Sequence, residues 1–209
     1  MKKLFLLLFS LFFLSSHSVF ADDISDFSIE GMSIGDSLLD YMNEEEILEE
    51  IEENKYMYTH LKEPNKYAQV FLFNSSKLYD DGLSFVIKNN SQSPYISNKN
   101  EKYLILSVQG MIGYNEDFVN CLKKRDKIVE DISDLFPNAE IYKTGNYLPS
   151  YETSGDSVKN DFYFNFKTKD MIELSCENLQ EDYREKMNYT EGLNIVTTSA
   201  EVAAWLRNK

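Results

Sequence analysis

The stretch from Tyr103 to Pro137 constrains the fold of this 209-residue chain more than any other segment. It opens with an apolar run that predicts a buried strand over 102–112. Apolar residues then recur at three- and four-residue steps among charged ones, which predicts an amphipathic helix over about 115–136. The apolar residues are Phe118, Leu122, Val129, Ile132 and Phe136. Pro137 ends this helix, because a proline excludes the residue before it from the α region.

Apolar runs and turn residues elsewhere predict further strands and short helices. Strands are expected over 67–73, 83–88, 139–142, 161–167, 171–176 and 193–196, and short helices over 37–42, 44–53, 179–187 and after Ser199. Asn43 and Glu46 form a capping box for the helix over 44–53. The simplest topology for 67–112 is an antiparallel meander. The whole pattern predicts an α+β fold, with an antiparallel sheet of about five to seven strands packed against one long amphipathic helix (about 115–136), plus short N- and C-terminal helices.

The chain contains only two cysteines, Cys121 in the long helix and Cys176 at the end of a predicted strand. If Thr168 to Asp170 form a hairpin turn, three phenylalanines share one face with the next strand. In that register Phe166, Phe164 and Phe162 lie opposite Ile172, Leu174 and Cys176. A helix packed on this face presents Cys121 to Cys176, so we predict a disulfide. A reactive thiol and two free buried cysteines are the alternatives.

Arg125 interrupts the apolar stripe of the long helix. A charge buried there would need a partner. The commoner arrangement, which we expect, lays the alkyl stem along the apolar surface and leaves the guanidinium in water.

The first 21 residues have the pattern of a secretory signal peptide. Two lysines precede an apolar run from Leu4 to Leu14, and Val19 and Ala21 fit the −3 and −1 positions of a cleavage site. We expect cleavage near Ala21-Asp22 and a single globular domain over 22–209. The run is short for a membrane span, and no lipid-anchor cysteine follows it. A periplasmic or secreted location and no stable membrane anchor in the mature chain are therefore expected.

Acidic residues dominate the charge of the chain. Residues 1–21 hold 2 of the 21 basic residues and none of the 35 acidic ones, so 19 basic and 35 acidic residues remain after cleavage, a formal charge of −16. Phosphate groups repel such a chain, so nucleic acid and anionic lipid are not expected partners. The seven glutamates over 44–53 are expected to form a solvated helix face, because the glycine-centred pattern of a calcium loop is absent.

Gly35-Asp36-Ser37-Leu38 matches the signature of the GDSL serine hydrolases. A serine hydroxyl needs a positioned base to become a nucleophile, and that family supplies one from a downstream D-x-x-H. His60 is the only histidine after residue 21, and Met57 stands three residues before it. We therefore interpret this run as a helix start with Asp36 as its N-cap, and we predict no catalytic residue, no metal site and no cofactor.

Two resemblances concern the N-terminal half. The run from Ile29 to Tyr41, IEGMSIGDSLLDY, with EEEI over 44–47, resembles the opening of uncharacterised exported proteins of AT-rich marine proteobacteria. That resemblance implies export and no particular activity. The expected order of two short helices and a three-strand meander over 31–112 also resembles the small modules of outer-membrane assembly lipoproteins and β-lactamase inhibitors, without their lipid-anchor cysteine.

These observations favour a non-catalytic binding or interaction protein of the periplasm. Its sheet and its long polar loops, 89–101 and 144–160, are expected to contact an unknown protein or small ligand. A cell-envelope hydrolase that uses carboxylates or a serine is an alternative, although the 35 acidic residues offer too many pairs for a choice. An interaction module of envelope assembly is a second alternative.

Overall fold

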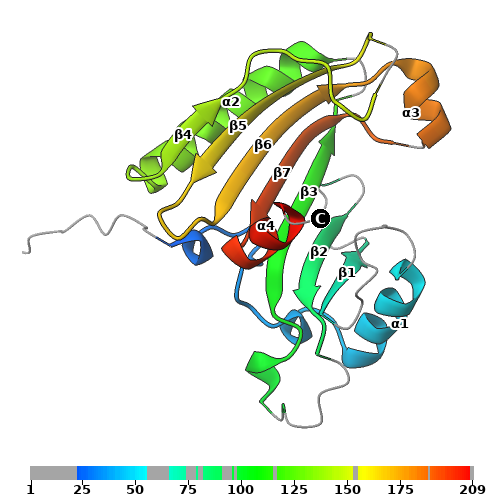
Figure 1. Cartoon of the computed structure of the whole chain (residues 1–209), viewed down its shortest axis with the longest axis vertical. Coiled ribbons are helices and arrows are strands. Elements are labelled where there is room, and N and C mark those ends of the chain that lie inside the picture. The colour runs from blue at the N-terminus through cyan, green and yellow to red at the C-terminus, as the bar shows by residue number, and fades with distance from the viewer. Residues whose placement is uncertain are drawn as a thin grey trace, which may run out of the picture.

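Figure 1 shows a computed structural model of the chain. The structure describes residues 23–55, 66–73, 79, 82–90, 96, 98–114, 117–152, 155–187 and 189–207. The expected signal peptide, its cleavage position and both histidines, His17 and His60, lie outside the described residues.

The described residues form one antiparallel sheet of seven strands, which confirms the predicted α+β class (Figure 1). The strand order is β1-β2-β3-β7-β6-β5-β4. The first three strands make the predicted meander, and the last four make a second meander whose final strand pairs with β3 at the centre. The strands are β1 (Tyr67–Leu72), β2 (Leu83–Lys88), β3 (Ile105–Gly113), β4 (Glu140–Lys143), β5 (Val158–Asn165), β6 (Met171–Asn178) and β7 (Gly192–Thr198).

In the described ranges four α-helices accompany the sheet: α1 (Glu44–Asn54), α2 (Phe118–Leu135), α3 (Glu181–Met187) and α4 (Ala200–Arg207). Short 3-10 helices cover Ile24–Asp26, Leu38–Asp40 and Lys99–Glu101. The predicted capping box of α1 is confirmed, because the side chains of Asn43 and Glu46 each accept a hydrogen bond from the other's backbone N–H.

The long helix α2 is slightly shorter than predicted. It begins at Phe118, and its N-cap is Asp117, whose side chain accepts a hydrogen bond from the backbone N–H of Asn120. Residues 115 and 116, at the start of the predicted helix, lie outside the described residues. Apolar periodicity alone does not determine where a helix begins, because the first turn depends on its cap.

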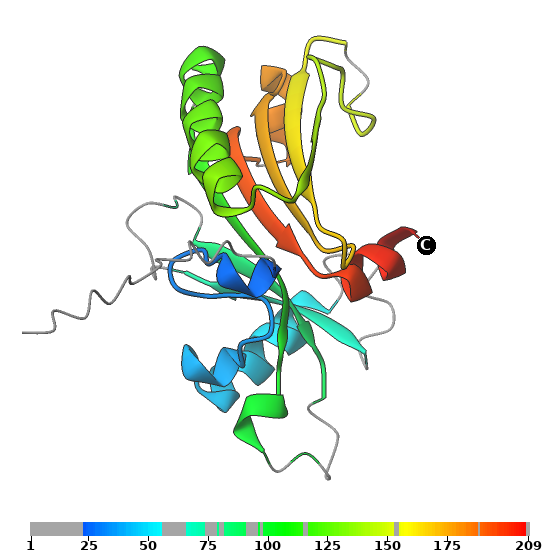
Figure 2. The ribbon, with the colours of Figure 1, turned by 90° about the vertical axis from the view of Figure 1, so that its left-hand side faces the viewer.

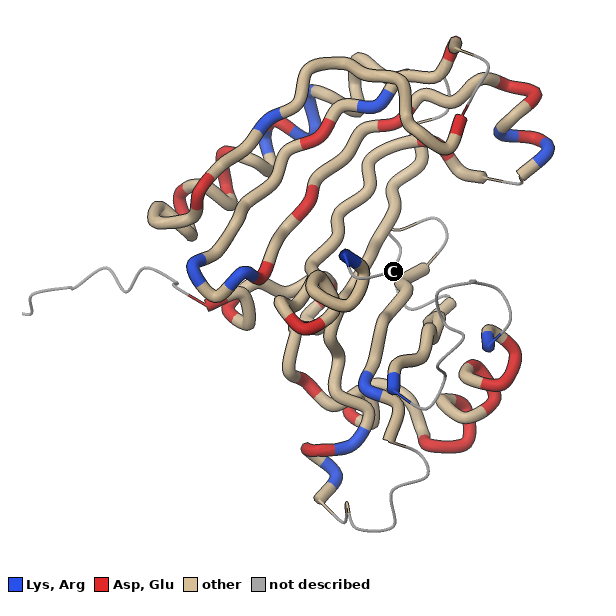
Figure 3. The backbone as a smooth tube through the Cα atoms, viewed as in Figure 1, with Lys and Arg blue, Asp and Glu red and all other residues tan. Residues whose placement is uncertain are grey.

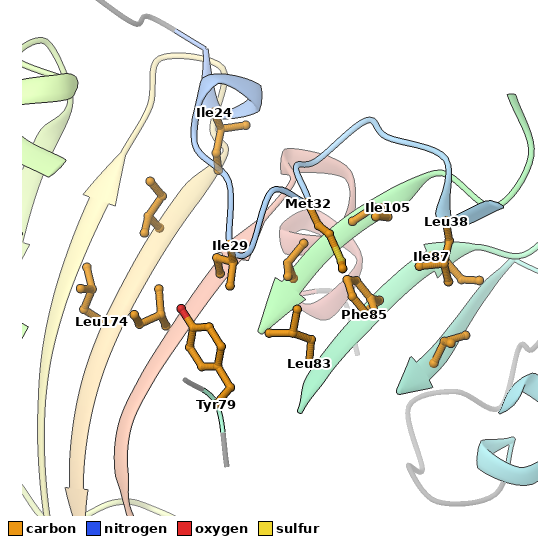
Figure 4. Close-up of a cluster of buried hydrophobic side chains, with 14 of the residues drawn as sticks. Ile24, Ile29, Met32, Leu38, Tyr79, Leu83, Phe85, Ile87, Ile105 and Leu174 are labelled. Atoms are coloured by element: carbon orange, nitrogen blue, oxygen red, sulfur yellow. The ribbon is translucent and has the colours of Figure 1, made fainter. Parts of the chain in front are cut away.

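Helices α2 and α4 lie on opposite faces of the sheet (Figures 1 and 2). The face under α2 carries the main hydrophobic core. Its lower part is covered by the N-terminal segment, whose Ile29 and Met32 point toward the strands near Tyr79 and Phe85 (Figure 4). Ile29 and Met32 of this segment form an isolated bridge, because Glu30 and Gly31 turn the chain between them with positive φ angles.

The C-terminal helix covers part of the other face with a second, smaller core. Val202 and Trp205 of α4 pack with Tyr67 and Leu106. The Tyr67 hydroxyl donates a 2.9 Å hydrogen bond to Glu201, and Ser199 caps the helix as predicted. The remainder of this face, above β5 and β6, is not covered by a helix (Figure 1).

The β5–β6 hairpin differs from the predicted register by two residues. Phe164 pairs with Ile172 and Phe162 with Leu174, so Cys176 lies opposite Asn160. The turn residues are 167–169, closed by a hydrogen bond from the Phe166 N–H to the Asp170 carbonyl. Lys169 adopts the left-handed conformation at φ 72°, which this three-residue loop requires. A shift of two residues preserves the faces of the strand.

Cys121 and Cys176 lie at disulfide-bonding distance, with their Cα atoms 6.0 Å apart. Both side chains are fully buried. The bond joins α2 to β6, as the shared face of the hairpin predicted.

The expectation for Arg125 was wrong, because its side chain is only 2 % exposed. The guanidinium donates a 3.0 Å hydrogen bond to the Asn160 carbonyl and a 2.7 Å hydrogen bond to the Asp126 carboxylate. Its central carbon lies 4.9 Å from the centroid of the Phe162 ring. Two of these partners, Asn160 and Phe162, belong to β5, and Asn160 lies 35 residues after Arg125 in the chain. Together the partners satisfy the buried charge of Arg125 between the helix and the sheet.

Candidate functional site

The face of the sheet opposite α2, which we call the polar face, carries the unusual chemistry of this protein. Strands β5 and β6 alternate, so that Phe162, Phe164 and Leu174 face the core while six other side chains share the polar face. The six are Lys159, Asp161 and Tyr163 of β5 and Glu173, Ser175 and Glu177 of β6. In the ladder Lys159 pairs with Glu177, Asp161 with Ser175 and Tyr163 with Glu173.

Lys159 is surrounded by three carboxylates, and we call these four residues the ion cluster. Its Nζ lies 3.1 Å from Glu177, 3.3 Å from Glu173 and 3.8 Å from Asp161. All four side chains are largely or fully buried. Three carboxylates against one ammonium leave a formal charge of −2 on this part of the polar face.

Asp161 is the most buried member of the ion cluster, with an exposed fraction of 0 %. One carboxylate oxygen accepts hydrogen bonds from the hydroxyls of Tyr147, at 2.5 Å, and Tyr163, at 2.8 Å. Within the described part of the chain the other oxygen, Oδ1, has no hydrogen-bond partner, although Lys159 lies 3.8 Å away. Tyr147 comes from the long loop between β4 and β5, so this contact ties the loop to the sheet.

Burial and mutual charge shift the pKa values in the ion cluster. Desolvation alone would lower the pKa of Lys159, but Glu173, Glu177 and Asp161 together raise it above its usual value. Burial raises the pKa of Glu173, and the neighbouring Asp161 and Glu177 add to that effect against the opposing charge of Lys159.

The pKa values of the nearby tyrosine hydroxyls are also raised. The pKa values of Tyr147, Tyr151 and Tyr163 are raised first by burial and then by the carboxylates beside them. These tyrosines therefore remain neutral hydrogen-bond donors at physiological pH.

A cleft of about 460 Å³ lies on the polar face beside the ion cluster. Strands β1, β2, β3, β7 and β6 form its floor, and residues from the loop before β5 and from the segments on either side of α3 form its wall. The lining residues are Phe71, Gly82, Ser84, Gln109, Met111, Tyr151, Glu177, Leu179, Tyr189, Thr190 and Asn194. Glu177 belongs both to the cleft and to the ion cluster, so the two form one continuous site.

Aromatic rings build the upper wall of the cleft. Tyr183 stacks on Tyr151 at a centroid distance of 6.2 Å and meets Tyr189 edge-on at 6.1 Å. Tyr151 and Tyr189 are both about half exposed. Rigid, half-exposed tyrosines are typical of recognition surfaces, because they bury a large area at a small cost in side-chain entropy.

Among the described residues, two buried polar atoms beside the cleft have no hydrogen-bond partner. They are Oδ1 of Asn194, which lines the floor, and Oγ of Ser175, which pairs with Asn194 across β6 and β7 on the polar face. Buried polar atoms are normally satisfied by protein or by a bound molecule, so the unpaired oxygen of Asn194 marks the floor as a place where a further group is accommodated.

The serine of the GDSL run has a structural role. Ser37 is buried, and its hydroxyl lies 3.0 and 2.8 Å from the carbonyl oxygens of Lys99 and Lys102. It also caps the 3-10 helix Leu38–Asp40, so the predicted cap, Asp36, was wrong. The Asp36 carboxylate instead accepts hydrogen bonds from the Ser33 N–H and from the Tyr41 hydroxyl; burial and this contact raise the pKa of Tyr41 to about 12.

Other candidate features carry no site in the structure. Within the described parts of the chain, no three His, Cys, Asp or Glu side chains are grouped so that they can hold a metal ion. In those same parts, none of the helices combines the length and apolar character that crossing a membrane requires. The glutamates of α1 lie along a helix at the β1 edge of the sheet (Figure 3), and Glu50 accepts a hydrogen bond from the backbone N–H of Phe71.

The polar face was not found by sequence reasoning, although its signal was present. The alternation of 161–167 was interpreted through its phenylalanines alone. The intervening positions, Lys159, Asp161 and Tyr163, together with Glu173 and Glu177 across the hairpin, carry opposite charges on one face. One of the two loops that were expected to contact a ligand, 144–160, contributes to the site, since it supplies Tyr147 and Tyr151. In the other loop, 89–101, residues 91–95 and 97 lie outside the described residues.

Comparisons of this chain with family models, with curated proteins and with solved structures found no match.

Proposed function

We propose that this chain is an exported, non-catalytic binding protein that holds its ligand in the cleft on the polar face. The observation that carries the proposal is the cleft itself, which combines aromatic walls, neutral polar groups and one carboxylate. This mixture is typical of ligand sites, where apolar side chains supply contact area and a few polar groups fix orientation.

The chemistry of the ion cluster supports a binding role rather than catalysis. The carboxylates of Glu173 and Glu177 both contact Lys159, and Asp161 accepts two tyrosine hydroxyls. Each of the three carboxylates has at least one oxygen held by a partner inside the sheet, which favours a structural role for the ion cluster over proton transfer. Export is supported by the signal-peptide pattern of 1–21 and by the Cys121–Cys176 pair, since disulfides persist mainly in oxidising compartments.

A screen by thermal shift tests the binding role. The purified protein is heated with aromatic compounds that carry a cation, no charge or an anion. At least one compound is expected to raise the melting temperature of the wild type. The same compound is expected to leave the melting temperature of Ser84→Trp unchanged, because an indole at this lining position fills the cleft. Ser150→Trp, at an exposed position outside the cleft, is the matched control. If no compound distinguishes Ser84→Trp from the wild type, the cleft is not a ligand site.

A carboxylate hydrolase is the second candidate, favoured by the raised pKa of Glu173 beside a second carboxylate. A panel of nitrophenyl glycosides and esters tests this candidate. Turnover that is abolished by Glu173→Gln and retained by Glu45→Gln, an exposed position on α1, would replace the binding proposal with the hydrolase.

A further inference from the structure

The charge around the cleft favours one class of ligand. Among the described residues that line it, Glu177 is the only ionisable side chain other than tyrosine, and none is Lys or Arg. Behind Glu177 the ion cluster holds three carboxylates and one ammonium. A partly buried surplus of negative charge attracts cations and repels anions more strongly than the same charge in open water.

The hydrogen-bonding groups at the floor of the cleft also favour a cationic ligand, because such a ligand is a hydrogen-bond donor. Oδ1 of Asn194 is an acceptor only, is buried, and has no hydrogen-bond partner among the residues that the structure describes. Asn194 pairs with Ser175 across the ladder, and Glu177 follows two residues after Ser175 on the same face. Asn194 and Glu177 are therefore diagonal neighbours, with Cβ atoms roughly 7 Å apart, a separation that admits one N–H donor group between the two acceptors.

The walls of the cleft fit the remainder of an organic cation. Tyr151 and Tyr189 present half-exposed rings, and Phe71, Met111 and Leu179 contribute apolar surface. Aromatic faces attract ammonium groups through the ring quadrupole and also pack against an apolar body. A hydrated metal ion would leave this surface unused.

We infer that the cleft binds an organic ammonium ion, with its charged nitrogen between Glu177 and Oδ1 of Asn194 and its apolar body against Tyr151 and Tyr189. This inference rests on the proposed binding function and adds the ligand class. The ion cluster holds Glu177 in position, because Lys159 fixes its carboxylate from the side away from the cleft and leaves the surplus of negative charge intact.

Three probes of one shape test the inference by titration calorimetry: 2-phenylethylamine, 2-phenylethanol and 3-phenylpropionate. The amine is expected to bind at least tenfold more tightly than the alcohol, and the carboxylate is expected to bind more weakly than the alcohol. The preference for the amine is expected to shrink when sodium chloride is raised from 20 to 300 mM, because salt screens the charge.

Ser84→Lys and Ser84→Gln separate charge from size in this test. Ser84 lines the cleft from β2 and is not a member of the ion cluster, so neither change removes a contact of Lys159. Ser84→Lys is expected to weaken amine binding at least tenfold, and Ser84→Gln less than threefold. Circular dichroism melting of both variants shows that the fold is retained.

The outcomes distinguish the two proposals. If the alcohol or the carboxylate binds as tightly as the amine, and Ser84→Trp abolishes that binding, the binding function stands and the cationic class is overturned. Equal loss of amine binding in Ser84→Lys and Ser84→Gln also overturns the cationic class. If none of the three probes binds and the wider thermal-shift panel also fails, both proposals are overturned.

Discussion

Replacing Lys159 by methionine removes the only cation of the ion cluster and leaves three carboxylates without a counter-charge. Methionine keeps the length and apolar stem of lysine, so packing changes little. At an effective dielectric constant of about 20, each of the three contacts is worth roughly 4–5 kcal/mol. Most of this attraction is offset by the desolvation of Lys159, which costs several kcal/mol. Loss of one partner of a buried ionic group typically costs 3–5 kcal/mol, and we expect about 3 kcal/mol here, because the Lys159 side chain is 15 % exposed.

The effect of Lys159→Met depends on pH with a definite sign. In the wild type burial already raises the pKa of Glu173, and Lys159 opposes that rise. Without the ammonium the folded-state pKa of Glu173 rises further above its unfolded value, so the ionised carboxylate destabilises the fold. Protonation of Glu173 removes this penalty, and the loss of stability shrinks as the pH falls through that raised pKa. In the wild type the pKa of Lys159 is itself raised, so its contribution is complete below its ordinary pKa of 10.5 and is lost only as the pH rises through the folded value.

Urea unfolding at pH 7 and pH 4 measures both effects. At pH 7 we expect about 3 kcal/mol of lost stability, or a melting temperature lower by about 6–12 °C for a chain of this size. At pH 4 less than half of that deficit is expected. Lys127→Met, at an exposed position of α2, is the matched control and should change stability by less than about 0.5 kcal/mol at either pH. A deficit below 1 kcal/mol at pH 7, or an equal deficit at both pH values, would refute the electrostatic account of the ion cluster.

Two further predictions concern the core. The double variant Cys121→Ala, Cys176→Ala should lose about 4 kcal/mol of folding stability, because the disulfide closes a loop with a separation of 55 residues. Calorimetry measures this loss. An unchanged melting temperature would contradict the chain-entropy argument. Gly110→Ala should lose about 1–3 kcal/mol in urea unfolding, because its Cβ would lie 2.5 Å from the buried ring of Tyr79. Gly145→Ala, with no atom within 4 Å, is the control, and an equal loss there would show that the ring contact is unimportant.

The elements that could be predicted from sequence are those whose causes are local. The capping box at Asn43, the apolar stripe of α2 and the alternation of β5 each depend on residues within a few positions of one another, and the structure has all three. The meander β1-β2-β3 follows from the order of its strands, because strands that are consecutive in sequence usually lie side by side. The shared face of the β5–β6 hairpin was also predictable, because an error of two residues does not change the side on which a residue lies.

The errors came from contacts between distant segments and from one turn that has no local signal in the sequence. Arg125 is buried because Asn160, 35 residues later, offers its carbonyl, and periodicity in the helix carries no information about that strand. The hairpin register depends on Lys169, a residue type that gives no local signal for a left-handed turn. The cleft draws its lining from five strands and four connecting segments, so it exists only after the whole sheet is assembled.

The central position of β7 has a consequence for the order in which this protein folds. β7 is the last strand in the chain, yet it lies between β3 and β6. A chain that is synthesised N-terminus first therefore presents two incomplete half-sheets, each with an unpaired edge, until residues 192–198 arrive. Unpaired edges are templates for aggregation. The Cys121–Cys176 bond lies entirely within the portion that arrives before β7, so oxidation can fasten α2 to the second half-sheet and reduce its conformational freedom before the last strand closes the gap.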